Sequence, residues 1–173
     1  MCVSIVFGAN LASGRVSQFI QRIDELGRVY EYGIAIGQEN LLPGAGEKIT
    51  TALAEPHVIF EVHDLPEPHC ACDIDDDIRI CSKQGQKSKF FDFIRETLEY
   101  EDIQSLSILF FQEELPDEHE ARKHLGTYDD FVELLNRWNT WQVEGFEPTR
   151  RAYYIADEKP LFFTFIDKKL FFA

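Results

Sequence analysis

Short apolar runs recur along the chain, and the polar or glycine-containing segments between them indicate where strands end. The first run covers residues 2–7 and predicts a buried strand. Comparable runs rich in β-branched and aromatic residues predict strands at 29–36, 58–62 and 106–111. Longer amphipathic or polar segments separate these runs, which favours a sheet combined with helices.

Two segments in the first hundred residues instead place apolar residues at the spacing of one helix face. Residues 14–26 predict a helix that Ser13 caps and that ends at Gly27. Residues 87–98 predict another amphipathic helix. We expect both helices to bury their apolar faces against the predicted sheet.

A further helix is predicted after Thr127 and Asp130, whose spacing is that of a capping pair. The apolar stripe of this helix consists of Phe131, Leu134, Leu135, Trp138 and Trp141. Exposed Trp side chains would be anchors for a partner. Because both Trp residues continue the stripe, we expect them to pack in the core.

The segments between these elements are less regular. Residues 41–46 predict a loop, and 49–54 a short helix or turn. Residues 64–77 are dense in Pro, Asp and Cys, which predicts an irregular loop, or a short hairpin together with 78–81.

The end of the chain has an antiparallel character. Two apolar runs at 152–156 and 161–166 flank a polar turn and predict a C-terminal hairpin. Strands and helices alternate only near the start of the chain. We therefore expect the α+β class: a mixed or mainly antiparallel sheet with two or three packed helices.

Composition adds an expectation of one domain spanning residues 1–173. The length suits a single domain, and no repeat or linker divides the chain. No run reaches the roughly 18 apolar residues that span a bilayer. The first residues lack the basic start and long apolar run of a signal peptide, so we expect a cytoplasmic protein.

Charge narrows the classes of partner. The chain has 31 Asp and Glu against 17 Lys and Arg, a formal net charge of −14. Such a chain repels nucleic acids and anionic membranes, because phosphate binding needs clustered Lys and Arg. It attracts a basic protein and accelerates encounter with it. We therefore expect neither nucleic acid nor membrane as a partner.

The cysteines open two alternatives to a binding protein. Cys2 would become an N-terminal nucleophile if Met1 were removed, which would suit a thiol-dependent hydrolase. Cys70, Cys72 and Cys81 lie near three His residues and could form a small metal-binding module. The spacing is not that of a common zinc site. We expect free thiols, no metal and no cofactor.

Acidic residues gather in two places. The first is 73–77, where an EF-hand loop would require Gly and Glu at positions held by Ile78 and Gln84. The second is 99–120, which contains no Lys or Arg. Either a cationic partner balances this second group, or Arg95 and neighbouring basic residues do so locally.

No motif of a catalytic site occurs. The segment 42–48 lacks the Gly-Lys-Ser/Thr ending of a phosphate-binding loop, and the sequence contains neither Gly-x-Ser-x-Gly nor His-Glu-x-x-His. We therefore expect a non-catalytic binding protein rather than an enzyme.

In size, acidity and α+β composition the chain resembles bacterial immunity proteins, such as those that protect against contact-dependent growth inhibition. The resemblance implies a tight complex with a basic toxin domain, often a nuclease, which the immunity protein inhibits by occlusion. It implies that carboxylates meet the cationic groups with which the toxin holds phosphates. The carboxylates expected to bind this partner are Glu113, Glu114, Asp117, Glu118 and Glu120, and secondly Asp75, Asp76 and Asp77.

Overall fold

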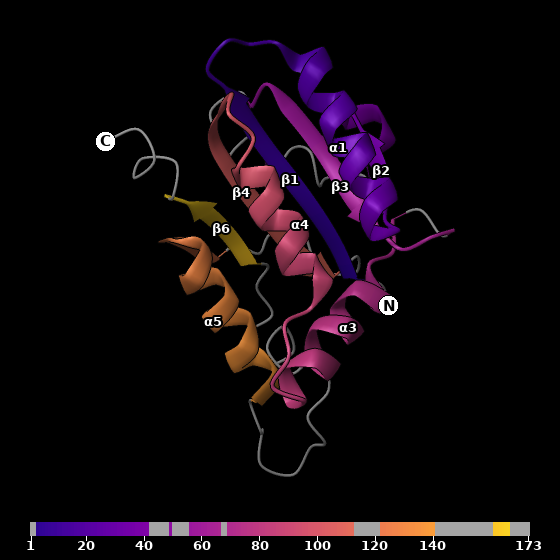
Figure 1. The fold of residues 1–173 in the computed structure, drawn as a ribbon, viewed down its shortest axis with the longest axis vertical. Helices are drawn as coiled ribbons and strands as arrows, with labels where there is room; N and C mark the ends of the chain where they lie inside the picture. The colour runs from indigo at the N-terminus through magenta and orange to yellow at the C-terminus, as the bar shows by residue number, and fades with distance from the viewer. Residues whose placement is uncertain are drawn as a thin grey trace.

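The computed structural model describes residues 3–41, 49, 56–66, 69–112, 122–140 and 161–166. Within these residues, six strands form one sheet, and four α-helices pack against it (Figure 1). The strands are β1 (Val3–Leu11), β2 (Gly33–Ile36), β3 (Val58–His63), β4 (Ile103–Gln112), β5 (Arg122–Gly126) and β6 (Leu161–Phe165). The helices are α1 (Val16–Tyr30), α3 (Cys72–Lys83), α4 (Lys89–Leu98) and α5 (Tyr128–Thr140), with a short 3₁₀ turn, η1 (Gln38–Asn40).

The sheet is mixed but mainly antiparallel, as predicted. Its strand order is β2-β3-β1-β4-β6-β5, and only the β5–β6 pair is parallel. Together with the helices, this sheet confirms the α+β class. Within the predicted C-terminal hairpin, β6 confirms the second strand. Residues 152–156 lie outside the described residues, so the hairpin itself stays a prediction.

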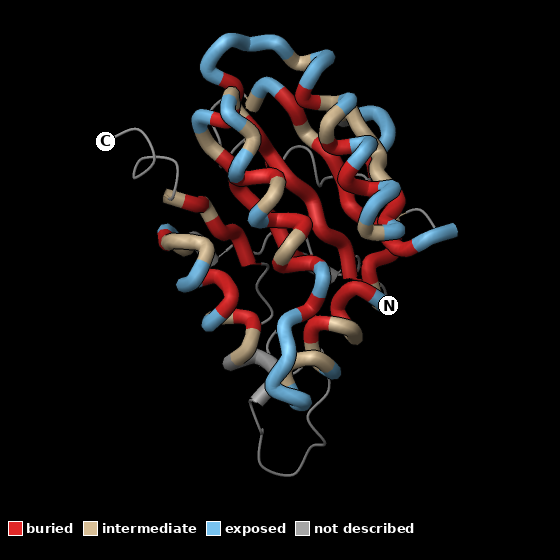
Figure 2. Tube along the Cα trace, viewed as in Figure 1, coloured by how far each residue is buried: buried red, intermediate tan, exposed pale blue. Residues whose placement is uncertain are grey.

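The core lies between the sheet and the helices, where the inward positions are buried (Figure 2). Phe7 of β1 stacks on Phe60 of β3, with ring centroids 4.8 Å apart. The edges of Phe90 and Phe93 of α4 pack against Phe7 at 6.3 and 6.0 Å. These aromatic contacts hold α4 over the centre of the sheet.

A second aromatic group fastens α5 to the other end of the sheet. Phe131 is fully buried and contacts Phe110, Phe163 and Phe165. This arrangement confirms that the apolar stripe beginning at Phe131 faces the core. The Trp138 side chain and Trp141 lie outside the described residues, so their packing stays a prediction.

Local capping signals place the starts of two helices. The Thr127 N–H donates to Asp130 Oδ2 at 2.8 Å, and the Asp130 N–H donates to Thr127 Oγ1 at 3.2 Å, which confirms the predicted capping pair. At the start of α4, Ser88 Oγ accepts a hydrogen bond from the Phe90 N–H at 3.2 Å. None of the described helices combines the length and apolar character needed to cross a membrane.

The predicted boundaries of α1 were wrong at both ends. The helix continues through Gly27 to Tyr30 and ends at Glu31, whose φ of 60° is left-handed. Gly27 serves close packing instead, because a Cβ there would lie 2.7 Å from Ile34 Cγ1. Ser13 does not cap the helix; its N–H donates to Asp102 Oδ1 at 2.9 Å.

The prediction of a loop at 64–77, or a hairpin with 78–81, was wrong from Cys72 onward, whereas the described residues between 64 and 71 are irregular. Residues 72–83 form α3, one helix more than expected. Ile74 and Ile78 are one turn apart and both bury in the core. Acidic residues in the first turn stabilise a helix by interacting with its dipole, so the Asp-rich sequence is compatible with a helix start.

Candidate functional site: an acidic cleft

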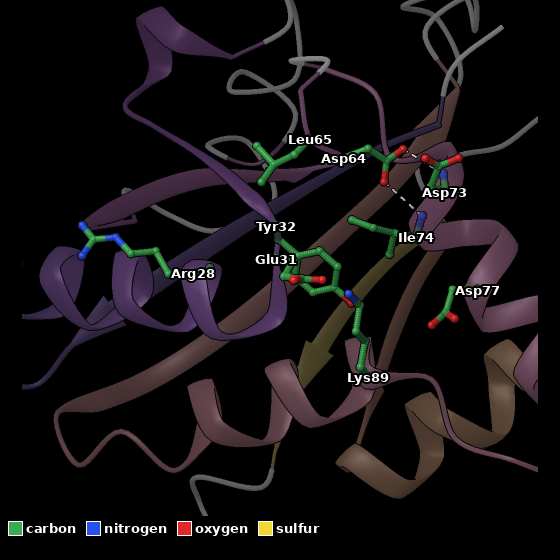
Figure 3. Close-up of a pocket in the computed structure, with 10 residues that line it drawn as sticks. Arg28, Glu31, Tyr32, Asp64, Leu65, Asp73, Ile74, Asp77 and Lys89 are labelled. Carbon is green, nitrogen blue, oxygen red and sulfur yellow. Dashed lines mark hydrogen bonds between the residues drawn. The ribbon is translucent and has the colours of Figure 1, made fainter.

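Helices α1, α3 and α4 converge beside the end of β3 and leave a cleft of about 730 Å³ (Figure 3). Ligand pockets commonly have volumes of roughly 300–1,000 Å³. The charged residues that line it are Glu31, Asp64, Asp73, Asp77, Arg28 and Lys89. We call this region the acidic cleft, because its four carboxylates outnumber its two cations.

Asp64 directly follows β3 and holds the start of α3. Its Oδ2 accepts a hydrogen bond from the Asp73 N–H at 2.7 Å, and its Oδ1 accepts one from the Ile74 N–H at 3.1 Å. These are two of the N–H groups that a helix start leaves without intrahelical partners. Burial nevertheless raises the pKa of Asp64, and the two backbone hydrogen bonds only partly oppose that rise. The carboxylate is therefore part of the scaffold.

Asp77 connects α3 to the start of α4. Its Oδ2 accepts a hydrogen bond from the hydroxyl of Ser88, the residue that caps α4. Its Oδ1 lies 3.6 Å from Cys81 Sγ. Burial, followed by the charge of Asp77, raises the pKa of the Cys81 thiol. Asp77 thus reaches the cleft with both carboxylate oxygens already engaged.

Tyr32 forms an inner wall of the cleft. Its side chain packs against Phe90 and Phe93, and the residue is only 7% exposed. Its hydroxyl is buried and has no hydrogen-bond partner among the described residues. Burial first, and then the negative charges of Asp77 and Asp64, raise the pKa of Tyr32. The hydroxyl is therefore neutral, and it lies within the field of two carboxylates that line the cleft.

Neither cation of the cleft neutralises an acidic side chain there. Lys89 Nζ donates to the Tyr30 carbonyl oxygen at 2.8 Å and lies 5.0 Å from the centre of the Tyr32 ring. The Arg28 side chain extends away from Asp64 and Asp73 (Figure 3). Excess negative charge therefore remains at the α3 side of the cleft.

Two carboxylates of the cleft remain available to a ligand. Glu31 and Asp73 are both exposed, and within the described part of the chain neither carboxylate takes part in a hydrogen bond or ion pair. Leu65, which is 59% exposed, adds an apolar surface to the lining of the same cleft. The arrangement suits a group that combines positive charge with an apolar stem.

The structure places the two predicted acidic groups differently. Glu113, Glu114, Asp117, Glu118 and Glu120 lie outside the described residues, so their role stays a prediction. Of the second group, Asp75 is only 7% exposed, and Asp76 accepts a hydrogen bond from Arg79 at 3.2 Å. Asp77 is the member of this group that lines the cleft.

The thiols do not assemble a site within the described residues. Cys70 is buried, and in the described part of the chain Cys70, Cys72 and Cys81 are thiols that form no disulfide. No three His, Cys, Asp or Glu side chains of the described chain are grouped so that they could hold a metal ion. Cys2 lies outside the described residues, so the thiol-hydrolase alternative stays untested.

Two of the histidines have structural partners instead. His57 Nδ1 accepts a hydrogen bond from the Leu11 N–H at 2.9 Å, which joins the start of β3 to the end of β1. His69 Nδ1 lies 2.9 Å from Oε2 of Glu61, a buried carboxylate in β3. These contacts stabilise the sheet and the segment after it rather than a common site.

Sequence reasoning missed most of the cleft. Glu31 and Tyr32 fell within a predicted strand, and Asp64 and Asp73 within a predicted loop. The available signal was Asp64 itself, an acidic residue directly after a buried strand and a few residues before an Asp-rich segment.

The cleft offers bound carboxylates that fix its shape, free carboxylates at its mouth and a neutral hydroxyl in its wall. Chemically, this set favours binding of a cation over proton transfer or nucleophilic attack. Comparisons with protein-family models, with curated proteins and with solved structures found no match to this chain.

Proposed function

We propose that this chain is a non-catalytic binding protein whose partner is a basic protein. The observation that carries the proposal is the acidic cleft, where Glu31 and Asp73 are exposed and unpaired within the described chain. A carboxylate in a partly enclosed cleft interacts with a cation more strongly than one on an open surface, because less water screens it.

The charge of the whole chain supports the same class of partner. A formal net charge of −14 steers a basic protein toward the surface and repels nucleic acids and anionic membranes. We further propose that the partner is a toxin domain, and that binding inhibits it by covering cationic groups with which it holds phosphates. In this role the chain acts as an immunity protein. Charge complementarity gives such a complex fast association and specificity.

The test uses a basic toxin domain encoded beside the gene for this chain. We expect a stable complex in which the toxin loses activity, with an association rate that falls as salt is added. Absence of a complex with such a domain, or a complex in which the toxin stays fully active, would refute the inhibitory role.

Charge reversal tests the first predicted surface. The double variant Glu113→Lys/Glu114→Lys should slow association about tenfold or more at low salt, while dissociation changes less. The control Asp24→Lys/Glu25→Lys changes the net charge equally on the exposed side of α1. Equal rates for the two variants would mean that net charge alone acts, and that Glu113 and Glu114 are not at the interface.

A further inference from the structure

Two independent features of the acidic cleft indicate a ligand. The first is the pair of exposed carboxylates, Glu31 and Asp73, that lack partners within the described chain. The second is Tyr32, which is more than nine-tenths buried and whose hydroxyl has no hydrogen-bond partner in the part of the chain that the structure describes. A buried polar group without a partner costs roughly 1–3 kcal/mol. A ligand that donates a hydrogen bond to this hydroxyl would recover that cost.

We infer that the acidic cleft receives an arginine side chain of the basic partner, whose guanidinium pairs with Asp73 and Glu31 and donates to the Tyr32 hydroxyl. This inference rests on the proposed function and identifies the group that the partner inserts. The aliphatic stem of the arginine lies against Leu65, the exposed apolar residue of the cleft.

The chemistry of the acceptors favours a guanidinium over an ammonium group. The acceptors come from separate elements: Glu31 and Tyr32 follow α1, whereas Asp73 belongs to α3. A guanidinium carries five N–H donors in a planar fork, so one group can serve several acceptors in different directions. It is also more weakly hydrated than an ammonium group, and its transfer into a partly enclosed cleft costs less.

A metal ion is a poorer fit to the same cleft. Asp64 and Asp77 already accept hydrogen bonds through both of their carboxylate oxygens. The described residues contain no group of three His, Cys, Asp or Glu side chains arranged for an ion. An arginine needs only the two free carboxylates and the hydroxyl.

The direct test is a titration of the isotope-labelled chain with N-acetylarginine methylamide, followed by amide chemical shifts. Shifts should concentrate at the amides of Gly27, Asp73 and Ile74, three residues that line the cleft. The neutral isostere N-acetylcitrulline methylamide should leave them unchanged, and the corresponding lysine compound should bind more weakly. No shift at these amides up to about 50 mM arginine compound would overturn the inference. Equal responses to the citrulline or lysine compound would overturn it as well.

Variants then assign the contacts. Asp73→Asn and Tyr32→Phe should each weaken binding of the arginine compound about fivefold, the loss expected for one hydrogen bond. The matched control is Asp129→Asn, which removes an exposed carboxylate from the first turn of another helix, α5. Control binding should equal that of the unchanged chain. If Asp129→Asn weakens binding as much as Asp73→Asn, bulk charge rather than the cleft binds the compound.

The same variants separate this inference from the proposed function. If the toxin complex forms and Asp73→Asn binds the toxin as tightly as the unchanged chain, the arginine assignment fails while the inhibitory role stands. If the arginine compound binds in the cleft but no basic domain forms a complex, the inhibitory role fails.

Discussion

Asp64 provides the sharpest test of how the cleft is built. Replacing it with Ala removes the acceptor of two backbone hydrogen bonds, from Asp73 at 2.7 Å and Ile74 at 3.1 Å. Loss of a helix cap usually costs about 0.5–2 kcal/mol. Removing the buried charge recovers part of that cost, because the raised pKa means that the fold disfavours the ionised form. We therefore expect Asp64→Ala to lower the free energy of unfolding by about 1–2 kcal/mol at neutral pH.

Asp64→Asn is the isosteric comparison, because it removes the charge and keeps one acceptor oxygen for the two backbone N–H groups. It should lower the free energy of unfolding by less than Asp64→Ala does, by about 0.5–1 kcal/mol at neutral pH. The pH dependence has a definite sign. A raised carboxyl pKa means that the folded state binds its proton more tightly than the unfolded state, so stability falls as pH rises from the ordinary value of 3.8 through the folded pKa. Relative to Asp64→Asn, the unchanged chain should therefore gain stability on acidification.

Urea unfolding measures these differences, and amide hydrogen exchange locates them. In Asp64→Ala the amides of Asp73 and Ile74 should lose protection before those in the centre of α4. A 1–2 kcal/mol loss corresponds to a decrease in Tm of about 2–8 °C for a chain of this size. Unchanged stability of the Ala variant would refute the capping role. A stability advantage over Asp64→Asn that grows with rising pH would refute the reasoning about burial.

Three further predictions concern the scaffold. Gly33→Ala should lower the free energy of unfolding in urea by about 1–3 kcal/mol, because the new Cβ would lie 2.0 Å from the His63 ring. A similar loss in a His63→Ala background would contradict this cause. Asp102→Asn should be less stable than the unchanged chain at neutral pH and equally stable in strong acid. The Ser13 hydrogen bonds lower the pKa of Asp102, and the stabilisation they give is lost as pH falls. A stability difference that does not vary with pH would contradict this reasoning. Tyr128→Phe should move the midpoint of alkaline unfolding, measured by circular dichroism, to higher pH. Burial raises the pKa of Tyr128 to about 12, so the stability of the unchanged chain declines above the ordinary value of 10.0. An unchanged or lower midpoint would contradict the role of burial.

The elements that were predictable from sequence have local causes. The strand at 58–62 and the helix at 87–98 follow from side-chain periodicity, and the Thr127–Asp130 pair uses neighbouring residues. Periodicity decides which side is buried wherever one face is apolar, so these predictions needed no knowledge of distant contacts.

The elements that were missed depend on contacts between distant parts of the chain. The start of α3 is capped by Asp64 from the end of β3 rather than by its own N-cap residue, Ala71. Gly27 lies inside α1 where Ile34 of β2 leaves no room for a Cβ, although glycine is common at helix ends. The cleft was missed because it depends on both the start of α3 and the end of α1. Its residues meet only after α1, α3 and α4 have packed.

The cleft divides its carboxylates between two tasks, and this division makes stability and binding separable. Asp64 and Asp77 are engaged by the start of α3 and by Ser88, so replacing them should loosen the scaffold. Asp73 contributes only its charge near the α3 start, worth about 0.3–1 kcal/mol, while its carboxylate stays exposed in the cleft. Tyr32→Phe removes a buried hydroxyl that has no partner within residues the structure describes, so the empty fold should keep or gain stability while the arginine compound binds more weakly. If Tyr32→Phe instead destabilised the fold, the hydroxyl would have a structural partner, and the strongest sign of a ligand in this cleft would be lost.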